Sequence, residues 1–258
     1  MRWRLGVVGS PIAHSLSPQL HEAGLKLAGL EGASERVELN ADDATTLREM
    51  MGRRFDALSV TMPLKPVAAS LCDSLDDAAR RTGVVNSLLT RDGHLLGACT
   101  DGAGLLAFLA HEYDFNARGQ HVLVLGAGGA AREIVDALVD AGAPSVSILG
   151  RTSARVAELA SRYDNVVALS DDETDWGLIV NATPATRDAV PLVTGVSAET
   201  IAVDITYDPR QTPWRSLYDE AGCRTTNGLG MLAYQAALQM KWWWDVDIDG
   251  ARLLEVIT

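Results

Sequence analysis

The chain has 258 residues, of which 47% are apolar and 22% are charged. A chain of this length can form one large domain or two modest ones without disulfides or a structural metal. Its net charge of −12 disfavours nucleic acid and anionic membranes as partners.

The cysteines and the N-terminus bear on the compartment. Cys72, Cys99 and Cys223 are spaced for neither a disulfide framework nor a zinc site. The first apolar stretch is too short for a signal peptide, and no apolar run is long enough to span a membrane. We therefore expect reduced thiols, no metal, no membrane partner and a cytoplasmic protein.

The first hundred residues alternate short apolar runs with helix-period segments. Strands are expected at 5–9, 36–39 and 57–61, and a hairpin is expected at 84–90 and 94–98 around a turn at 91–93. A helix is expected at 17–30, with Ser17 as its N-cap and Pro18 as its first helical residue.

The second half reads as a βαβ series. Strands are expected at 121–125, 145–149, 178–180 and 201–205, and helices at 102–113, 128–141, 229–243 and 250–257. Continuous Val, Ile and Leu runs are typical of parallel strands buried on both faces. We predict an α/β fold with two lobes, one at 1–101 and a second, Rossmann-like, at 102–226. The C-terminal helices, from 227 to 258, are expected to return to the first lobe.

A glycine-rich turn follows the strand at 121–125. Gly126, Gly128 and Ala131 match the spacing G-x-G-x-x-G/A, which makes a tight turn and lets a pyrophosphate approach the start of a helix. The whole turn includes Ala127, Gly129 and Ala130. Such turns also occur without a nucleotide, so the motif alone is a weak signal.

The end of the next strand indicates which nucleotide would bind. An NAD enzyme places an acid there for the ribose hydroxyl. This chain has instead Arg151 and Thr152, followed by Arg155. A guanidinium pairs with a phosphate, which favours NADP. The alternative is that both arginines are a solvated helix start.

Lys65 and Asp101 each follow an expected strand of the first lobe. If the two strands lie side by side, the two side chains meet across a cleft. A lysine beside an aspartate can polarise a ketone oxygen and relay a proton to it. The alternative is a surface lysine and an aspartate that caps the helix at 102–113.

Eight segments resemble the shikimate dehydrogenase family, in family order. They are GSPIAHSLSPQLH at 9–21, VTMPLK at 60–65, GVVNSL at 83–88, TDGAG at 100–104, LGAGGAAR at 125–132, NATP at 181–184, DITYDPRQTP at 204–213 and NGLGMLAYQ at 227–235. The resemblance covers nearly the whole chain. It implies a substrate-binding lobe at 1–101, completed by 227–258, and an NADP-binding lobe at 102–226.

The resemblance also implies roles for particular residues. Lys65 and Asp101 are the implied catalytic pair. Ser15 and Ser17 would hold the substrate carboxylate, and Thr61, Asn86 and Gln235 the ring hydroxyls. Thr100 and Tyr207 are the other implied substrate-site residues. The implied cofactor residues are Gly126, Ala127, Gly128, Gly129, Ala130, Ala131, Arg151, Thr152, Arg155, Thr183, Gly228 and Met231.

Several positions depart from the family pattern. Ser59, Glu22, Cys99 and Gly150 each stand where the family commonly has asparagine, and Leu64 where it commonly has histidine. Ala185 and Thr186 replace a small residue and glycine after Pro184. The departures near the ring site leave the ring substrate open, and those near Arg151 and Pro184 bear on cofactor binding.

The implied activity is the NADP-dependent reduction of 3-dehydroshikimate to shikimate, in aromatic amino acid biosynthesis. The alternatives are a quinate/shikimate or aminoshikimate dehydrogenase, or a non-catalytic NADP-binding sensor. The expected partner is the small-molecule substrate, and the expected assembly is a monomer or homodimer.

Overall fold

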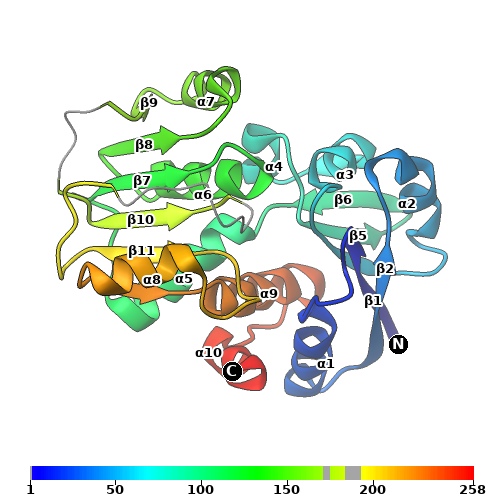
Figure 1. The fold of residues 1–258 in the computed structure, drawn as a ribbon. Coiled ribbons are helices and arrows are strands. Elements are labelled where there is room, and N and C mark those ends of the chain that lie inside the picture. Colours follow the sequence, from blue (N-terminus) through cyan, green and yellow to red (C-terminus); the bar gives the residue numbers. More distant parts are fainter. Residues whose placement is uncertain (1, 171–174, 184–192) are drawn as a thin grey trace. The chain divides into compact units, whose positions relative to one another are not determined.

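A computed structural model describes residues 2–170, 175–183 and 193–258. The chain divides into two compact units (Figure 1). The first unit comprises the chain through Phe108 together with Gly230–Thr258, and the second comprises Leu109–Leu229. The predicted two-lobed α/β fold, with its C-terminal helices in the first lobe, is confirmed.

The boundaries between the units differ from the expected breaks at 101/102 and 226/227. The first boundary lies inside helix α5 (Asp101–Tyr113), and the second follows the first residue of helix α9 (Leu229–Trp244). A helix that continues from one unit into the next has no break in its hydrophobic pattern, so the sequence carries no signal at these positions.

The first unit is built on a six-stranded mixed sheet. Its strand order is β2-β1-β3-β5-β6-β4. The bounds are β1 Arg2–Gly9, β2 Glu31–Glu38, β3 Ala57–Val60, β4 Ser74–Leu75, β5 Ser87–Arg91 and β6 His94–Ala98. Strand β5 is antiparallel to both of its neighbours, β3 and β6, so β3 and β6 run in the same direction.

Three expected strands of this unit begin at other residues than predicted. Strand β1 begins at Arg2 instead of residue 5. Strand β2 begins at Glu31 instead of residue 36, and pairs with β1 along its whole length. It is an edge strand with exposed and half-exposed positions in alternation, so it has no apolar run to mark its start. Strand β5 begins at Ser87 instead of residue 84.

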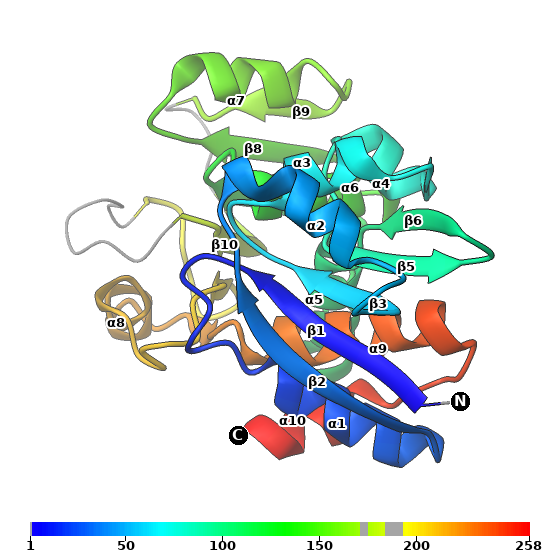
Figure 2. The same cartoon turned by 90° about the vertical axis from the view of Figure 1, so that its right-hand side faces the viewer.

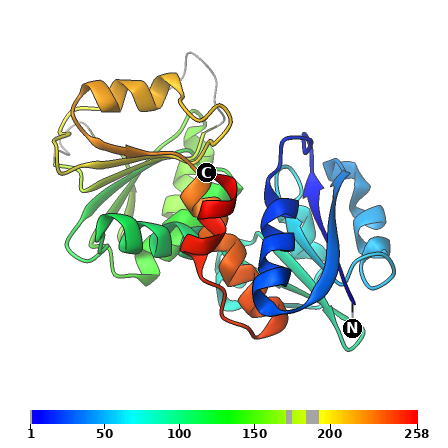
Figure 3. The same cartoon turned by 90° about the horizontal axis from the view of Figure 1, so that it is seen from below.

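Helices cover both faces of the sheet (Figures 1 and 2). Helices α2 (Ala44–Met50), α3 (Lys65–Leu71) and α4 (Asp77–Thr82) place Leu47, Ala68 and Ala79 in a core with the sheet residues Val8, Leu58 and Leu88. Helix α1 (Ser17–Ala28) packs against β2 and against α10 (Gly250–Ile257), beside α9 (Figure 3). A short 3-10 helix spans Ala41–Asp43.

The expected N-cap of the first helix was wrong. The N-cap residue is Leu16, and Ser17 is already helical. The amide of Ser17 donates to the hydroxyl of Ser15 at 3.3 Å, so the two serines are tied to each other instead of to the first turn. Pro18 is the second helical residue.

The second unit is a six-stranded parallel sheet with the order β12-β11-β10-β7-β8-β9. Counted from β7, this is the 3-2-1-4-5-6 order of the Rossmann fold. The strands are β7 His121–Leu125, β8 Ser145–Leu149, β9 Val166–Ala168, β10 Leu178–Asn181, β11 Ile201–Asp204 and β12 Arg224–Thr226. The helices are α6 Gly129–Asp140, α7 Ser153–Ala160 and α8 Pro213–Glu220.

The Rossmann order gives this sheet a switch point between β7 and β10, where the connections change direction. Ligands of such sheets bind beyond the carboxyl ends of the strands at this point. A ligand of this unit is therefore expected at the loops after β7 and β10. No helix in the described part of the chain is both long enough and apolar enough to cross a membrane.

Candidate functional site

Three polar side chains meet at one edge of the first sheet. Lys65 opens α3 just after β3, Asp101 opens α5 just after β6, and Asn86 directly precedes β5. Because β3 and β6 run parallel and β5 runs against them, both carboxyl ends and the amino end of β5 share an edge. The expectation that the Lys65 and Asp101 strands are neighbours was wrong, since β5 lies between them and brings Asn86.

Lys65 and Asp101 form an ion pair between Nζ and Oδ2. Lys65 is only 7% exposed, which excludes the alternative of a surface lysine. The side chain of Asp101 is 16% exposed, so one partner of the pair keeps access to solvent. The sequence-predicted pairing is therefore present within the first unit.

Asn86 orients the aspartate of this pair. Its Nδ2 donates to Oδ1 of Asp101 at 2.6 Å and to Oγ1 of Thr100 at 2.9 Å. Its Oδ1 accepts the backbone N–H of Thr100 at 2.8 Å, which fixes the amide orientation because an N–H can only donate. With one oxygen bound to Lys65 and the other to Asn86, the carboxylate of Asp101 is held from both sides.

Helix α9 brings Gln235 to the same cluster. Its Oε1 lies 3.3 Å from Nδ2 of Asn86 and 3.4 Å from Oγ1 of Thr100. Its Nε2 donates to the carbonyl of Leu232 at 2.8 Å. Both Thr100 and Gln235 are buried, so the first unit unites five of the implied substrate-site and catalytic residues in one network.

The two implied carboxylate-binding serines are also adjacent. Oγ of Ser15 lies 3.2 Å from Oγ of Ser17, and both residues are buried. Arg36, on β2, donates to the carbonyl of Ser15 from Nε at 2.8 Å and also from Nη2. Sequence reasoning missed Arg36, whose only signal was a cation in a polar edge strand. Its guanidinium supplies positive charge beside two neutral donors.

Thr61 follows β3 and is half-buried. Its amide donates to the carbonyl of Val8 at 2.9 Å, at the end of the neighbouring strand β1. It thus sits in the loop that runs from β3 to Lys65.

Cys99, one of the departures from the family pattern, braces the strand end before Asp101. Its Sγ donates to the carbonyl of Val84 at 2.9 Å, and its amide donates to Oδ2 of Asp76 at 3.3 Å. Burial raises the pKa of the Asp76 carboxyl. Leu64, another departure, is a fully buried core residue.

In the second unit, three loops converge at the switch point. Gly126 has φ +117°, and a Cβ placed there would lie 3.0 Å from the carbonyl oxygen of Ala182 and 3.4 Å from Cγ2 of Thr183. The amide of Gly126 donates to the carbonyl of Leu149 at 2.7 Å. The turn after β7 therefore contacts the segment after β10 and the end of β8.

The start of α6 suits a pyrophosphate. Its N-cap is Gly128, which has no side chain to cap the first N–H groups of the helix. A Cβ placed on Gly128 would have no heavy atom within 4 Å, so the space beside this residue is open. The first N–H groups of a helix lack intrahelical partners and carry partial positive charge. Gly129, Ala130 and Ala131 form that first turn, so the turn and its neighbours fit a dinucleotide.

Arg151, Thr152 and Arg155 lie together around the start of α7, and all three are exposed. Within the described residues, neither arginine makes an ion pair. Arg132 is occupied differently, since its Nη2 pairs with Oε1 of Glu158 at 3.1 Å. Arg151 and Arg155 thus remain accessible cations beside the glycine turn.

The other implied residues are spread over the chain. The hydroxyl of Thr183 donates to Oδ1 of Asn181 at 2.6 Å. Tyr207 lies on the loop after β11 in the second unit, and the amide of Gly228 donates to the carbonyl of Thr206 at 3.2 Å. Met231 is buried in the first turn of α9. Pro184, Ala185 and Thr186 lie outside the described residues.

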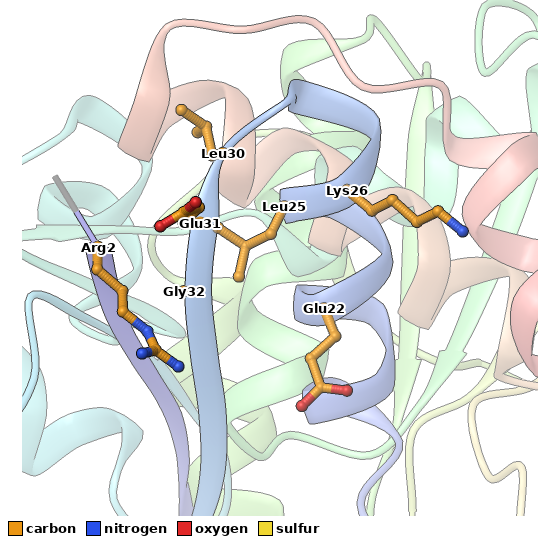
Figure 4. A pocket seen from close by; sticks show the side chains of 7 residues that line it. All are labelled: Arg2, Glu22, Leu25, Lys26, Leu30, Glu31 and Gly32. Atoms are coloured by element: carbon orange, nitrogen blue, oxygen red, sulfur yellow. The ribbon is translucent and has the colours of Figure 1, made fainter.

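A separate hollow of about 520 Å³ contains none of these residues. It is contributed by α1, by β1 and by the start of β2 (Figure 4). It is lined by Arg2, Glu22, Leu25, Lys26, Leu30, Glu31 and Gly32. In the described part of the chain, no three His, Cys, Asp or Glu residues are grouped as metal ligands.

Two family models match separate segments of the chain, one in each half. Residues 7–88 match the model for the shikimate dehydrogenase substrate binding domain, and residues 109–187 match that for shikimate / quinate 5-dehydrogenase. A shikimate dehydrogenase (NADP(+)) of an Exiguobacterium species is 40% identical over 97% of both chains.

Two solved structures are similar throughout. Shikimate 5-dehydrogenase from Thermus thermophilus, in complex with NADP(H) and shikimate, is 33% identical, with a TM-score of 0.88 over 99% of this chain and 98% of that one. A 5-ketofructose reductase of a Gluconobacter species is 27% identical, with a TM-score of 0.84 over 98% and 96%. With the identity, the coverage and the Lys65–Asp101 pair all in agreement, the chain belongs to the shikimate dehydrogenase family.

Proposed function

We propose that this chain is an NADP-dependent shikimate dehydrogenase that reversibly reduces 3-dehydroshikimate to shikimate, in aromatic amino acid biosynthesis. The observation that carries the proposal is the ion pair between the buried Lys65 and the partly exposed Asp101, with Asn86 donating to the second oxygen of the aspartate. The Exiguobacterium relative that is 40% identical to this chain is a shikimate dehydrogenase (NADP(+)), which supports the proposal.

The ring substrate would bind to the first unit. The hydroxyls of Ser15 and Ser17 would donate to its carboxylate, with the charge of Arg36 nearby. Thr61, Asn86 and Gln235 would hold the ring hydroxyls, with Thr100 as their support and Tyr207 as a further contact. Neutral donors backed by one cation suit an anion that the acidic surface repels in bulk.

The nucleotide would bind to the second unit. The turn from Gly126 to Ala131 would hold the pyrophosphate through backbone N–H groups. Arg151, Thr152 and Arg155 would hold the 2′-phosphate, and Thr183, Gly228 and Met231 would lie along the nicotinamide end. When bound, NADPH supplies the hydride for the ketone carbon and is oxidised to NADP⁺.

Lys65 would donate the proton in the reduction and accept it in the oxidation. Its ammonium donates a hydrogen bond to the ketone oxygen and passes it a proton, so that the C=O group becomes CH–OH. The neutral amine then regains a proton from solvent. In the oxidation of shikimate the amine accepts the hydroxyl proton instead. Asp101 holds the amine in place and stabilises its charged form.

We also propose which partners, compartment and assembly the enzyme has. With a net charge of −12, the chain has no charge complementarity to nucleic acid or anionic lipid. We place the enzyme in the cytoplasm, as a monomer or homodimer.

A steady-state assay that crosses NADP⁺ and NAD⁺ with shikimate and quinate tests this function. We expect the highest kcat/KM for shikimate with NADP⁺. Lys65→Met should lower kcat by roughly 10³-fold, because a positioned acid or base contributes that order. The matched control, Lys26→Met, replaces an exposed lysine of α1 and should keep kcat. Equal turnover by folded Lys65→Met would refute the role of Lys65.

A related ring substrate is the second candidate, because Ser59 and Leu64 depart from the family pattern close to Thr61 and Lys65. Higher kcat/KM with quinate or aminoshikimate would assign the chain to such a sibling enzyme. NADP binding without any turnover would indicate a sensor.

A further inference from the structure

A buried chain of hydrogen bonds ends at the backbone of Asn86. It starts at Ser34 on β2, whose Oγ lies 2.8 Å from Nδ1 of His21, and continues from Nε2 of His21 to Oγ of Ser59 at 2.9 Å. The hydroxyl of Ser59 donates to Oε1 of Gln239 at 2.7 Å, and Nε2 of Gln239 donates to the carbonyl of Asn86 at 2.9 Å. His21 and Gln239 are fully buried.

The direction of every bond in this relay follows from its last member. A backbone carbonyl can only accept, so Gln239 must point its NH₂ at Asn86 and its oxygen at Ser59. Ser59 therefore gives its proton to Gln239 and accepts one from Nε2 of His21. The Nδ1 atom of His21 is left as an acceptor for Ser34. One arrangement of protons satisfies all four bonds.

The relay needs a neutral imidazole at its centre. Burial lowers the pKa of His21 to about 3, so the ring stays uncharged throughout the range in which dehydrogenases are assayed. The ring of Trp243 packs edge-on against it, with 5.3 Å between ring centroids. The relay is therefore a fixed structural element and not a proton path.

Helix α9 contacts the start of β5 at three successive turns of one face. Gln235 contacts the side chain of Asn86, Gln239 contacts its carbonyl, and Nε1 of Trp243 donates to Oγ of Ser87 at 2.9 Å. Residues four apart share a helix face, so one rigid element holds both ends of Asn86.

We infer that Gln239 is a positioning residue for the reaction: it fixes the backbone of Asn86 so that the Asn86 amide meets Asp101. The inference rests on the proposed function, because Asp101 matters through Lys65. The carbonyl of Asn86 also accepts the amide of Val60 at 2.7 Å, so it keeps a partner when Gln239 is changed. A variant at Gln239 should therefore fold. Asn86, whose N–H also donates to the carbonyl of Ala98 at 3.1 Å, would lose one of its three backbone hydrogen bonds and with it part of the constraint on its position.

Gln239→Met tests this, because methionine has a similar length and cannot donate. We expect kcat/KM for shikimate to fall roughly tenfold, which is the value of one well-placed hydrogen bond. The KM for NADP⁺ should stay within about twofold, since the second unit is unchanged. The matched control is Met240→Leu, a fully buried neighbour on α9 that packs against Gly24 outside the relay.

A purely structural role predicts a different result. Gln239→Met would then have a lower melting temperature, but the folded protein would keep the wild-type kcat and KM. That result would overturn the inference. Should it fail to fold, Ser59→Ala breaks the relay one step earlier and should lower kcat/KM in the same direction. The double variant of Ser59→Ala and Gln239→Met should lower kcat/KM no further than Gln239→Met alone, because both substitutions break the same chain of hydrogen bonds.

NMR keeps this test separate from that of the proposed function. Nitrogen shifts should show His21 protonated at Nε2, with no titration between about pH 5 and 9. The side-chain amide of Asn86 should shift in Gln239→Met and stay in place in Met240→Leu. The opposite tautomer, or an unmoved Asn86 amide, refutes the positioning role even if shikimate is oxidised. If shikimate is not oxidised, the proposed function fails, while these spectra still decide whether Gln239 places Asn86.

Discussion

Gly104 of α5 lies directly against the backbone of Gln235 on α9. A Cβ placed on Gly104 would lie 2.5 Å from the nitrogen of Gln235 and 2.6 Å from its Cα. Real Cβ atoms do not approach backbone so closely, so only glycine lets the helix that begins with Asp101 pack on the helix that carries Gln235. The spacing of the TDGAG segment thus has a packing reason.

Gly104→Ala should separate these two helices. Alanine favours a helix over glycine by about 1 kcal/mol, but a methyl group pressed on backbone costs about 1–3 kcal/mol. We expect a lower melting temperature and a several-fold higher KM for shikimate, because Gln235 moves away from Asn86. Ala103→Ser, at an exposed neighbouring position, is the control and should change neither. Normal stability and KM in Gly104→Ala would show that the contact is dispensable.

Arg36→Leu should weaken binding of the substrate carboxylate. The guanidinium holds the carbonyl of Ser15 and provides the positive charge beside Ser15 and Ser17. We expect the KM for shikimate to rise roughly tenfold, as for loss of a charge-assisted hydrogen bond, with a smaller change in kcat.

The control for Arg36 is Arg54→Leu. Arg54 pairs with Glu35 at 2.8 Å in an exposed ion pair, which contributes little. The KM of Arg54→Leu for shikimate should equal that of the wild type. An equal rise in KM for both variants would assign the effect to net charge instead of to the Ser15 contact.

Arg151→Ala should alter the choice of cofactor. If Arg151 pairs with the 2′-phosphate as proposed, its loss should raise the KM for NADP⁺ roughly tenfold or more and leave the KM for NAD⁺ unchanged. The control, Arg162→Ala, removes an arginine that pairs with Glu158 at 3.0 Å on the same unit. A parallel rise for both nucleotides would mean that Arg151 does not read the 2′-phosphate.

His21 should make the folded state sensitive to acid. Its pKa is about 3 in the folded chain and 6.5 in the unfolded chain, so protons bind the unfolded state first. The stability contribution is complete above pH 6.5 and declines by about 1.4 kcal/mol per unit as the pH falls toward 3. Urea unfolding at pH 7.5 and 5.0 measures this.

A non-titrating variant isolates that effect from those of other groups. His21→Gln should be less stable than the wild type at pH 7.5, and the gap should narrow by about 2 kcal/mol at pH 5.0. A pH-independent gap for His21→Gln would show that folding leaves the pKa of the ring unchanged.

Sequence pattern predicted the central strands best. Strands β7 and β8 were predicted to the residue, because strands buried on both faces are continuous apolar runs. Nine short or polar elements of the described residues were not predicted, namely α2, α3, α4, β4, α7, β9, α8, β12 and the 3-10 helix Ala41–Asp43. Helices of six to eight residues complete too few turns to show a period, and their stability comes from packing.

The amino-acid sequence by itself predicted the two-lobed α/β architecture and the glycine turn, since both depend on local pattern and short spacing. Its eight family-like segments indicated the family, and that resemblance implied the pairing of Lys65 with Asp101. Only the tertiary structure decided that β5 separates the strands of Lys65 and Asp101 and inserts Asn86 between them. It likewise decided that Gln239, 153 positions away, holds the carbonyl of Asn86. Contacts between such distant residues depend on strand order and helix packing, which no local period encodes.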